Sequence, residues 1–131
     1  ETALDMMVDR SLQRYSHGSI LAEKQGIQWM IADSKTELEA AKLCAFRAAQ
    51  LKEKGEARFS REAAVAKLFA TESAGKICDR ALQIHGGYGY AKEFHVERFL
   101  REVMIARIAP VSEQLVLCYV AERVLGLPKS Y

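Results

Sequence analysis

The sequence predicts an all-α protein built as an antiparallel, up-down-up-down four-helix bundle, with a short extra helix before the last one. Proline is absent until Pro110, and long proline-free stretches rich in Ala, Leu, Glu, Lys and Gln favour helices. Apolar residues recur at steps of three and four, which is the spacing of one helix face. No alternating strand pattern bounded by turn residues occurs in the sequence. We therefore expect one helical domain over residues 1–131.

The composition argues against several classes of protein. The 131 residues are 50% apolar and 27% charged, which suits one globular domain with a buried core and argues against intrinsic disorder. The 19 Lys and Arg residues against 17 Asp and Glu residues give a net charge of +2, and the two signs are mixed along the chain. This pattern argues against nucleic-acid binding. No apolar run approaches the roughly 20 residues of a membrane span, so we expect no span.

The start of the chain and its cysteines bear on its origin. The chain begins at Glu1 without a methionine or a signal-peptide pattern, so we expect a piece of a longer protein. Cys44, Cys78 and Cys118 lie far apart among alanine, leucine and valine, and not in a metal-ligand spacing. We therefore expect small buried side chains in a protein from a reducing compartment.

The first two helices follow from the apolar spacing. The first should end near residues 16–18, and its apolar face consists of Leu4, Met7, Val8, Leu12 and Tyr15. The second should run from about Ala22 to Lys54 and end at Gly55, a residue typical of helix C-caps. The charged stretch at residues 52–58 is then a solvated loop.

The third helix should begin with Ser60 as its N-cap and Glu62 in its first turn, because both residue types suit the positive end of a helix. Its apolar seam leads to the glycine cluster and consists of Ala64, Leu68, Thr71, Gly75, Cys78 and Leu82. A short helical piece should follow at about residues 94–105. The last helix should start at Pro110, which is favoured in a first turn, and stop before the last glycine.

The second and third helices carry more apolar residues than one core needs. An oligomer partner or further domains should therefore cover part of them. The aromatic residues Phe46, Phe69 and Phe99 are expected in the core. The single tryptophan, Trp29, is of a type that is common at interfaces.

The segment QIHGGYGY at residues 83–90 stands out from the helical background. Glycines permit positive φ and let backbone N–H groups approach an anion such as a diphosphate. A plain turn between two helices explains the same glycines, and the spacing is not the GxGxxG fingerprint of dinucleotide-binding folds. His17, His85 and His95 are expected at the surface or at helix caps, and their spacing to acidic residues predicts no metal site.

The same segment, together with FHVER at residues 94–98 and RE at residues 101–102, resembles the C-terminal domain of acyl-CoA dehydrogenases. The pattern of that family is Q-x-x-G-G-x-G-[YF], then an aromatic residue and proline before V-E-R/K, then R-D. Residues 25–49, 62–70 and 121–126 are similar to the second, third and last helices of the family domain. The resemblance covers essentially the whole chain. It implies that the N-terminal helical and middle β-domains of the family are absent from these residues.

The resemblance implies FAD as the cofactor of the full-length protein, with contacts from this domain to the FAD of a neighbouring subunit. Arg14 matches the family arginine that approaches the flavin diphosphate, a role that suits the fixed donors of a guanidinium. His17 stands where the family has phenylalanine, and it can still stack against the cofactor. The full set of implied cofactor residues is Arg14, His17, Gln25, Gln83, Gly86, Gly87 and Ser112.

The catalytic base departs from the family pattern. The family's Tyr-Glu-Gly-Thr falls on Ala-Pro-Val-Ser at residues 109–112, so that Pro110, or Ala109 with a one-residue gap, occupies the glutamate position. Glu113 is the nearest acid, but it should project about a helical turn away. Isovaleryl and long-chain relatives carry the base on the first helix of the domain, at a position that precedes Glu1. The base is therefore unknown, and a position upstream of Glu1 is one expectation.

The function implied is α,β-dehydrogenation of an acyl-CoA thioester in fatty acid metabolism, with electron-transfer flavoprotein as the acceptor. The resemblance also implies a homo-oligomer, a dimer or a tetramer, in the bacterial cytoplasm or the mitochondrial matrix. The isolated chain is expected to be inactive. Two alternatives stay open because of Pro110: a non-catalytic assembly module, and a flavin-dependent oxidase or monooxygenase relative.

Overall fold

The structure, a computed structural model, describes residues 1–130, and within them it is helical apart from one small hairpin and the connecting loops. The elements are, in chain order, α1 (Thr2–Gln13), β1 (Tyr15–Ser16), β2 (Ser19–Ile20), the 3-10 turn η1 (Leu21–Glu23), α2 (Gln25–Glu53), α3 (Ser60–His85), α4 (Gly87–Tyr90), the 3-10 turn η2 (Lys92–Phe94), α5 (Val96–Ile108), α6 (Glu113–Tyr119) and the π-helical turn η3 (Val120–Val124). The prediction of an all-α domain is confirmed.

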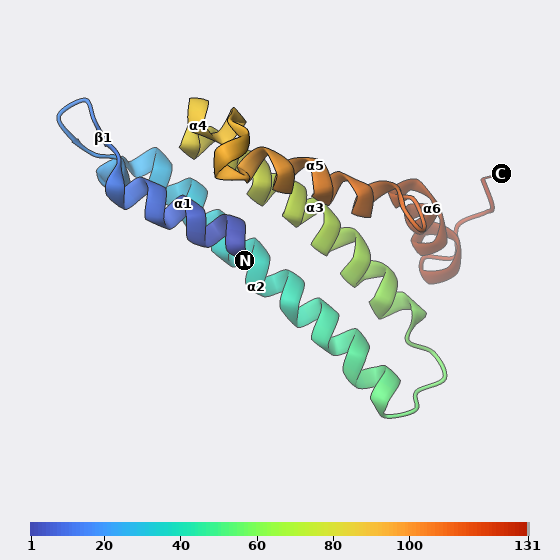
Figure 1. Ribbon diagram of the computed structural model, residues 1–131. Coiled ribbons are helices and arrows are strands. Elements are labelled where there is room, and N and C mark those ends of the chain that lie inside the picture. The colour runs from blue at the N-terminus through green and yellow to red at the C-terminus, as the bar shows by residue number, and fades with distance from the viewer. Residues whose placement is uncertain (131) are drawn as a thin grey trace.

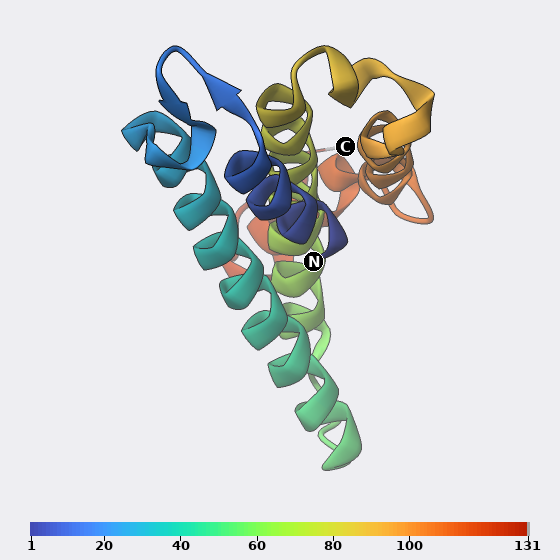
Figure 2. The same ribbon diagram turned by 60° about the vertical axis from the view of Figure 1, so that its left-hand side comes forward.

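Helices α2 and α3 form a long antiparallel pair, joined by the exposed charged loop that the sequence predicts (Figure 1). At 1.5 Å per residue, the 29 residues of α2 extend over about 43 Å. Helix α1 packs against both members of the pair, and α5 lies on another side of α3 (Figure 2). Helix α3 is therefore the central element, in contact with α1, α2, α5 and α6.

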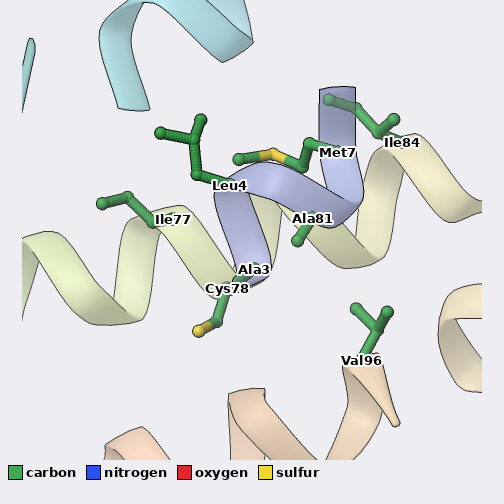
Figure 3. Packing of buried hydrophobic residues seen from close by; sticks show 8 residues of the cluster. All are labelled: Ala3, Leu4, Met7, Ile77, Cys78, Ala81, Ile84 and Val96. Atoms are coloured by element: carbon green, nitrogen blue, oxygen red, sulfur yellow. The ribbon is translucent and has the colours of Figure 1, made fainter. Parts of the chain in front are cut away.

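The hydrophobic core lies where α1 and the start of α5 meet the C-terminal half of α3 (Figure 3). Met7 of α1 and Ala81 of α3 are fully buried, both with 0% of their surface exposed. The small side chains on α3 let α1 approach closely, which is the packing that a seam of small residues favours. The cluster consists of Ala3, Leu4, Met7, Ile77, Cys78, Ala81, Ile84 and Val96.

A polar clamp joins α2 to α3 beside this core. The Arg80 guanidinium donates to a Glu37 carboxylate oxygen at 2.7 Å, and it also donates to the Ser34 hydroxyl at 3.3 Å. The Ser34 hydroxyl in turn donates to the backbone carbonyl of Met30 at 2.7 Å, so this fully buried side chain has its hydrogen bonds satisfied. The clamp fixes the register of the long helix pair.

The first helix ends earlier than predicted, at Gln13. The next residues form a two-stranded hairpin in which Tyr15 pairs with Ile20 and Ser16 with Ser19. His17 and Gly18 form its tip with φ of 51° and 82°, the backbone region that a tight hairpin turn requires. Strands of two residues are too short to show an alternating pattern, which is why the sequence did not reveal them.

The N-cap predicted for the third helix is wrong by one residue. Ser60 is already the first helical residue, and Phe59 occupies the N-cap position without a side-chain hydrogen bond. The polar residue that would cap this helix therefore has helical geometry instead. The predicted end of the helix at the glycine cluster is confirmed, because Gly86 follows its last residue, His85.

The predicted start of the last helix at Pro110 is also wrong. Helix α5 lies two to three residues further along the chain than the piece predicted at residues 94–105 and ends at Ile108, and α6 begins only at Glu113. Ser112 caps α6, since its hydroxyl oxygen accepts a hydrogen bond from the Leu115 N–H at 3.4 Å. Pro110 lies in the break between the two helices, after a cis peptide bond.

Two of the aromatic residues predicted in the core lie on the surface. Phe46 is 63% exposed and Phe69 is 37% exposed, whereas Phe99 packs against the core as predicted. Amphipathic spacing identifies apolar faces, but it does not say which of them another element covers. The remaining exposed apolar side chains of α2 to α6 include Trp29, Leu43, Val65, Met104, Ile105, Ile108, Val111, Leu115 and Leu117.

The C-terminal helices contain a longer apolar stretch than we expected from the sequence. Residues Val96–Val124 include 18 residues with a mean hydropathy of 1.5, and only 6% of that window is buried. The length and composition of the stretch would suit a membrane span, and the described residues contain one such stretch. The chain does not form one continuous helix there, because α5 ends at Ile108 and α6 starts at Glu113. Arg107 Nε also donates to the Glu113 carboxylate across the break, at 2.9 Å.

Candidate nucleotide-binding pocket

A pocket of about 360 Å³ lies where the C-terminal ends of α1 and α3 come together, next to the hairpin and α4. The hairpin and α4 occupy the same end of the long helix pair (Figure 1). The pocket is lined by Arg10, Arg14, Ser16, Leu21, Ile84, His85, Gly86, Gly87 and Tyr88. The fold thus joins two segments that are far apart in the sequence, and none of the lining side chains is a carboxylate.

Arg14 lies at the point where α1 ends and the hairpin begins. Its backbone N–H donates to the Arg10 carbonyl at 3.0 Å, and its carbonyl accepts from the Leu21 N–H at 2.7 Å. The backbone at Arg14 is therefore held from both sides while its side chain is exposed to solvent. A guanidinium placed in this way can present its donors to a ligand without giving up a protein partner.

The glycine turn forms the opposite wall of the pocket. Gly86 ends α3 with φ 59° and ψ −134°, a conformation that favours glycine. Gly89 folds back onto α3, where an added Cβ would lie only 2.6 Å from the Leu82 carbonyl oxygen. An added Cβ at Gly87 would meet no atom within 4 Å, so this position is open toward the pocket side of the turn. One glycine is thus needed for packing, and another leaves space.

His85 is buried, which contradicts the prediction of a surface or cap histidine. Only 7% of its surface is exposed, and its Nδ1 lies 2.8 Å from the Ala81 carbonyl oxygen. A carbonyl oxygen only accepts hydrogen bonds, so Nδ1 carries the hydrogen and Nε2 remains for another partner. His95 is at a helix boundary, as predicted: it precedes α5 in the left-handed region, with φ 59°.

Arg10 and Tyr88 are pocket residues that the sequence analysis missed. The Arg10 guanidinium carbon lies 4.5 Å from the centre of the Tyr88 ring. The Tyr88 ring stacks on Phe94, with ring centres 4.7 Å apart and an interplanar angle of 10°. The Nε of Arg10 is buried and has no hydrogen-bond partner. The signal that could have found Arg10 is its position four residues before Arg14, which places both side chains on one helix face.

The pocket contains three of the seven predicted cofactor residues, Arg14, Gly86 and Gly87. The other four do not line it. His17 is at the hairpin tip, where its Nδ1 lies 2.8 Å from the Ser16 hydroxyl oxygen. Gln25 and Gln83 are exposed outside the pocket, and Ser112 caps α6 at a different place in the fold. These four predicted cofactor residues therefore lie outside the pocket in this chain.

The residues that the resemblance aligns with a catalytic glutamate, Pro110 or Ala109, carry no carboxylate. Residues 109–112 form the break between α5 and α6, and the neighbouring Glu113 is engaged in its ion pair with Arg107. Within residues 1–130, no three His, Cys, Asp or Glu side chains are grouped so that they could hold a metal ion. The three cysteines are free, with Cys78 buried and the other two partly buried.

Comparisons with known proteins identify relatives of this chain. The sequence pattern of the family described as acyl-CoA dehydrogenase, C-terminal domain, matches residues 1–125. The caffeyl-CoA reductase-Etf complex subunit CarC of Acetobacterium woodii is 42% identical over 113 residues, which are 86% of this chain and 30% of that protein. The mitochondrial short-chain specific acyl-CoA dehydrogenase of Bos taurus is 40% identical over 131 residues, which are 100% of this chain and 31% of that protein.

The fold agrees as well. The solved structure of butyryl-CoA dehydrogenase from Megasphaera elsdenii matches with a TM-score of 0.90 and 35% identity, over 94% of this chain and 32% of that one. The chain therefore spans about a third of the length of the relatives that it matches. With both sequence and fold in agreement, the chain belongs to the acyl-CoA dehydrogenase family, whose C-terminal domain it represents.

Proposed function

We propose that this chain works as the C-terminal domain of a FAD-dependent acyl-CoA dehydrogenase, and that its pocket binds the diphosphate part of the FAD. One observation carries the proposal. Arg14 and the turn at Gly86 and Gly87 come from opposite halves of the chain, yet they line one pocket that has no carboxylate. An electropositive pocket with an open glycine turn suits a phosphorylated ligand.

The residues present fit such a ligand. The unpartnered Arg10 Nε is a buried donor that lacks an acceptor, and the position of Gly87 offers space for close approach to the backbone. In the full-length protein, FAD would accept a hydride from the β-carbon of an acyl-CoA thioester. The Arg14 guanidinium would hold a phosphate oxygen, and the buried, hydrogen-bonded His85 would fix the shape of the pocket wall. This domain therefore anchors and orients the cofactor.

The four predicted residues outside the pocket belong in this proposal to other parts of the cofactor. His17 and Gln25 lie on the hairpin side, and Gln83 lies on the last turn of α3. All three are exposed and therefore accessible to a neighbouring subunit or domain. Ser112 is partly buried, and its hydroxyl is already used as the cap of α6, so it is the weakest member of the set.

The catalytic base is assigned to a position outside these residues, upstream of Glu1. Support comes from the break at residues 109–112, which carries no carboxylate, and from Glu113, whose carboxylate is paired with Arg107 at 2.9 Å. The Glu113 carboxylate is therefore already engaged by a partner within the chain. The acyl-CoA substrate would be bound mainly by the domains that these residues do not include.

The exposed apolar side chains support a homo-oligomer, a dimer or a tetramer. Phe46 and Phe69 expose aromatic rings on the long helix pair, and Ile105 and Ile108 expose aliphatic side chains on α5. Large apolar side chains that stay exposed in this way are common at protein–protein interfaces. Electron-transfer flavoprotein is the proposed electron acceptor, and the bacterial cytoplasm or the mitochondrial matrix is the proposed compartment in a setting of fatty acid metabolism.

The test is made on the full-length gene product. We expect flavin absorbance in the purified protein and acyl-CoA-dependent reduction of an artificial electron acceptor. Arg14→Gln should lose flavin on gel filtration, whereas Lys35→Gln, on the exposed face of α2, should keep it. Oxygen consumption with bound flavin would instead support an oxidase or monooxygenase, and absence of flavin would support an assembly module. Either result would overturn the proposed dehydrogenase.

A further inference from the structure

We propose that Arg10 is a second phosphate-binding residue of this pocket, and that the pair of arginines makes the pocket selective for a diphosphate over a single phosphate. The inference rests on the proposed function, because it assigns a further residue to the same cofactor pocket. It concerns the recognition of the ligand and not the chemistry of the flavin.

Arg14 directly follows the last residue of α1, and its backbone N–H donates to the Arg10 carbonyl, so the two residues are one helical turn apart at the end of the helix. Both line the pocket. They differ in how they are held. Arg14 is exposed and can adapt to a ligand, whereas Arg10 is partly buried against the far wall of the pocket.

A stack of three planar groups holds Arg10 in place. The Arg10 guanidinium carbon lies 4.5 Å from the centre of the Tyr88 ring, and the Tyr88 ring also stacks on the Phe94 ring, with ring centres 4.7 Å apart. Arginine lies favourably over an aromatic face, and this contact does not use the N–H donors at the edge of the guanidinium. The side chain is therefore oriented before any ligand arrives, which reduces the entropy that binding costs.

The charge of Arg10 is not compensated by the protein. No carboxylate forms an ion pair with it in the described part of the chain, and its buried Nε has no acceptor. Arg14 adds a second positive charge one turn away, and like charges at this spacing repel. An unpaired donor beside a second cation lowers stability unless a negatively charged group completes the site.

A diphosphate ester matches this arrangement in charge and in number of groups. It carries at least two negative charges on two phosphate groups, and each guanidinium can donate to the oxygens of one group. A single phosphate would satisfy one arginine and leave the other exposed to repulsion. ADP and AMP share the adenosine and differ in this property, so they are suitable probes.

The experiment follows the Nε–H signals of Arg10 and Arg14 by NMR in the 15N-labelled chain while ADP or AMP is added. With ADP, both signals should shift with one dissociation constant, and ADP should bind about tenfold more tightly than AMP. Arg10→Gln should reduce ADP affinity to about the AMP level. Arg98→Gln is the matched control, because Arg98 also lies over an aromatic ring, Phe99 at 5.2 Å, but pairs with Glu102 outside the pocket.

The outcomes separate this inference from the proposed function. If ADP shifts Arg14 but leaves Arg10 unmoved, or if ADP and AMP bind equally well, the role of Arg10 is refuted and the cofactor pocket stands. If neither signal moves with ADP up to about 20 mM, the role of Arg10 is refuted, and flavin retention by the full-length protein decides the proposed function separately. Circular dichroism of each variant checks that it is folded. If Arg10→Gln does not fold, the signal shifts of the wild-type chain with ADP and AMP still decide the role of Arg10.

Discussion

Gly89→Ala tests whether the glycine turn is held by direct contact with α3. The added Cβ would lie 2.6 Å from the Leu82 carbonyl oxygen, 3.0 Å from Leu82 Cα and 3.1 Å from His85 Cβ. Two of these atoms are backbone within α3, so α4 would have to move by about 0.8 Å to restore ordinary contact. Overpacking of this kind costs about 1–3 kcal/mol. We expect a loss of about 2 kcal/mol, which lowers Tm by about 8 °C in a chain of this size.

Gly87→Ala is the matched control, two residues away in the same turn. Its added Cβ meets no atom within 4 Å, and its φ is not in the left-handed region. A stability change within about 0.5 kcal/mol is therefore expected, or a small gain from the stiffer unfolded chain. Urea unfolding followed by far-UV circular dichroism measures both variants. If Gly89→Ala unfolds at the same urea concentration as Gly87→Ala, the close approach is not what holds the turn.

Three further predictions concern titration and helix pairing. Burial raises the pKa of the Cys78 thiol, so iodoacetamide at about pH 8 should alkylate the two other cysteines first; equal rates by peptide mass spectrometry would contradict this. Glu37→Gln removes the carboxylate that pairs with Arg80 and should cost about 1–2 kcal/mol in urea unfolding; a loss below about 0.3 kcal/mol would show that the clamp contributes little. The hydrogen bond and charge of Lys76 hold the pKa of Glu72 below its usual range. Its contribution to stability is therefore present above the unfolded-state pKa and is lost as pH falls through the lower folded-state pKa. Lys76→Gln should raise the pKa of Glu72 toward its usual range, and an unchanged pKa by NMR would contradict the role of Lys76.

The helical elements could be predicted because their apolar residues follow helical spacing. Leu4 and Met7 belong to the face of α1 that is buried, and Cys78 belongs to the buried seam of α3. The boundaries were harder, because local sequence does not decide them alone. Pro110 suits a first helical turn, yet Ser112 provides the cap that α6 uses.

The pocket could be predicted only in part. The resemblance identified Arg14 and the glycine turn, but nothing in the linear sequence shows that the ends of α1 and α3 meet. Arg10 has the pattern of an ordinary helix charge, and its stacking on Tyr88 exists only in the folded chain. The surface positions of Phe46 and Phe69 could not be predicted for a related reason, because an apolar face has the same spacing whether or not a neighbour covers it.

The last turn of α3 belongs to the core and to the pocket at once. Ile84 is in the hydrophobic cluster, and the next residues, His85 and Gly86, are part of the pocket wall. The wall consequently has no hinge of its own, and opening it would require partial melting of the domain's most connected helix. Occupancy of the pocket and protection of the α3 amides against hydrogen exchange are therefore thermodynamically linked, so that a bound nucleotide would slow exchange deep inside the bundle.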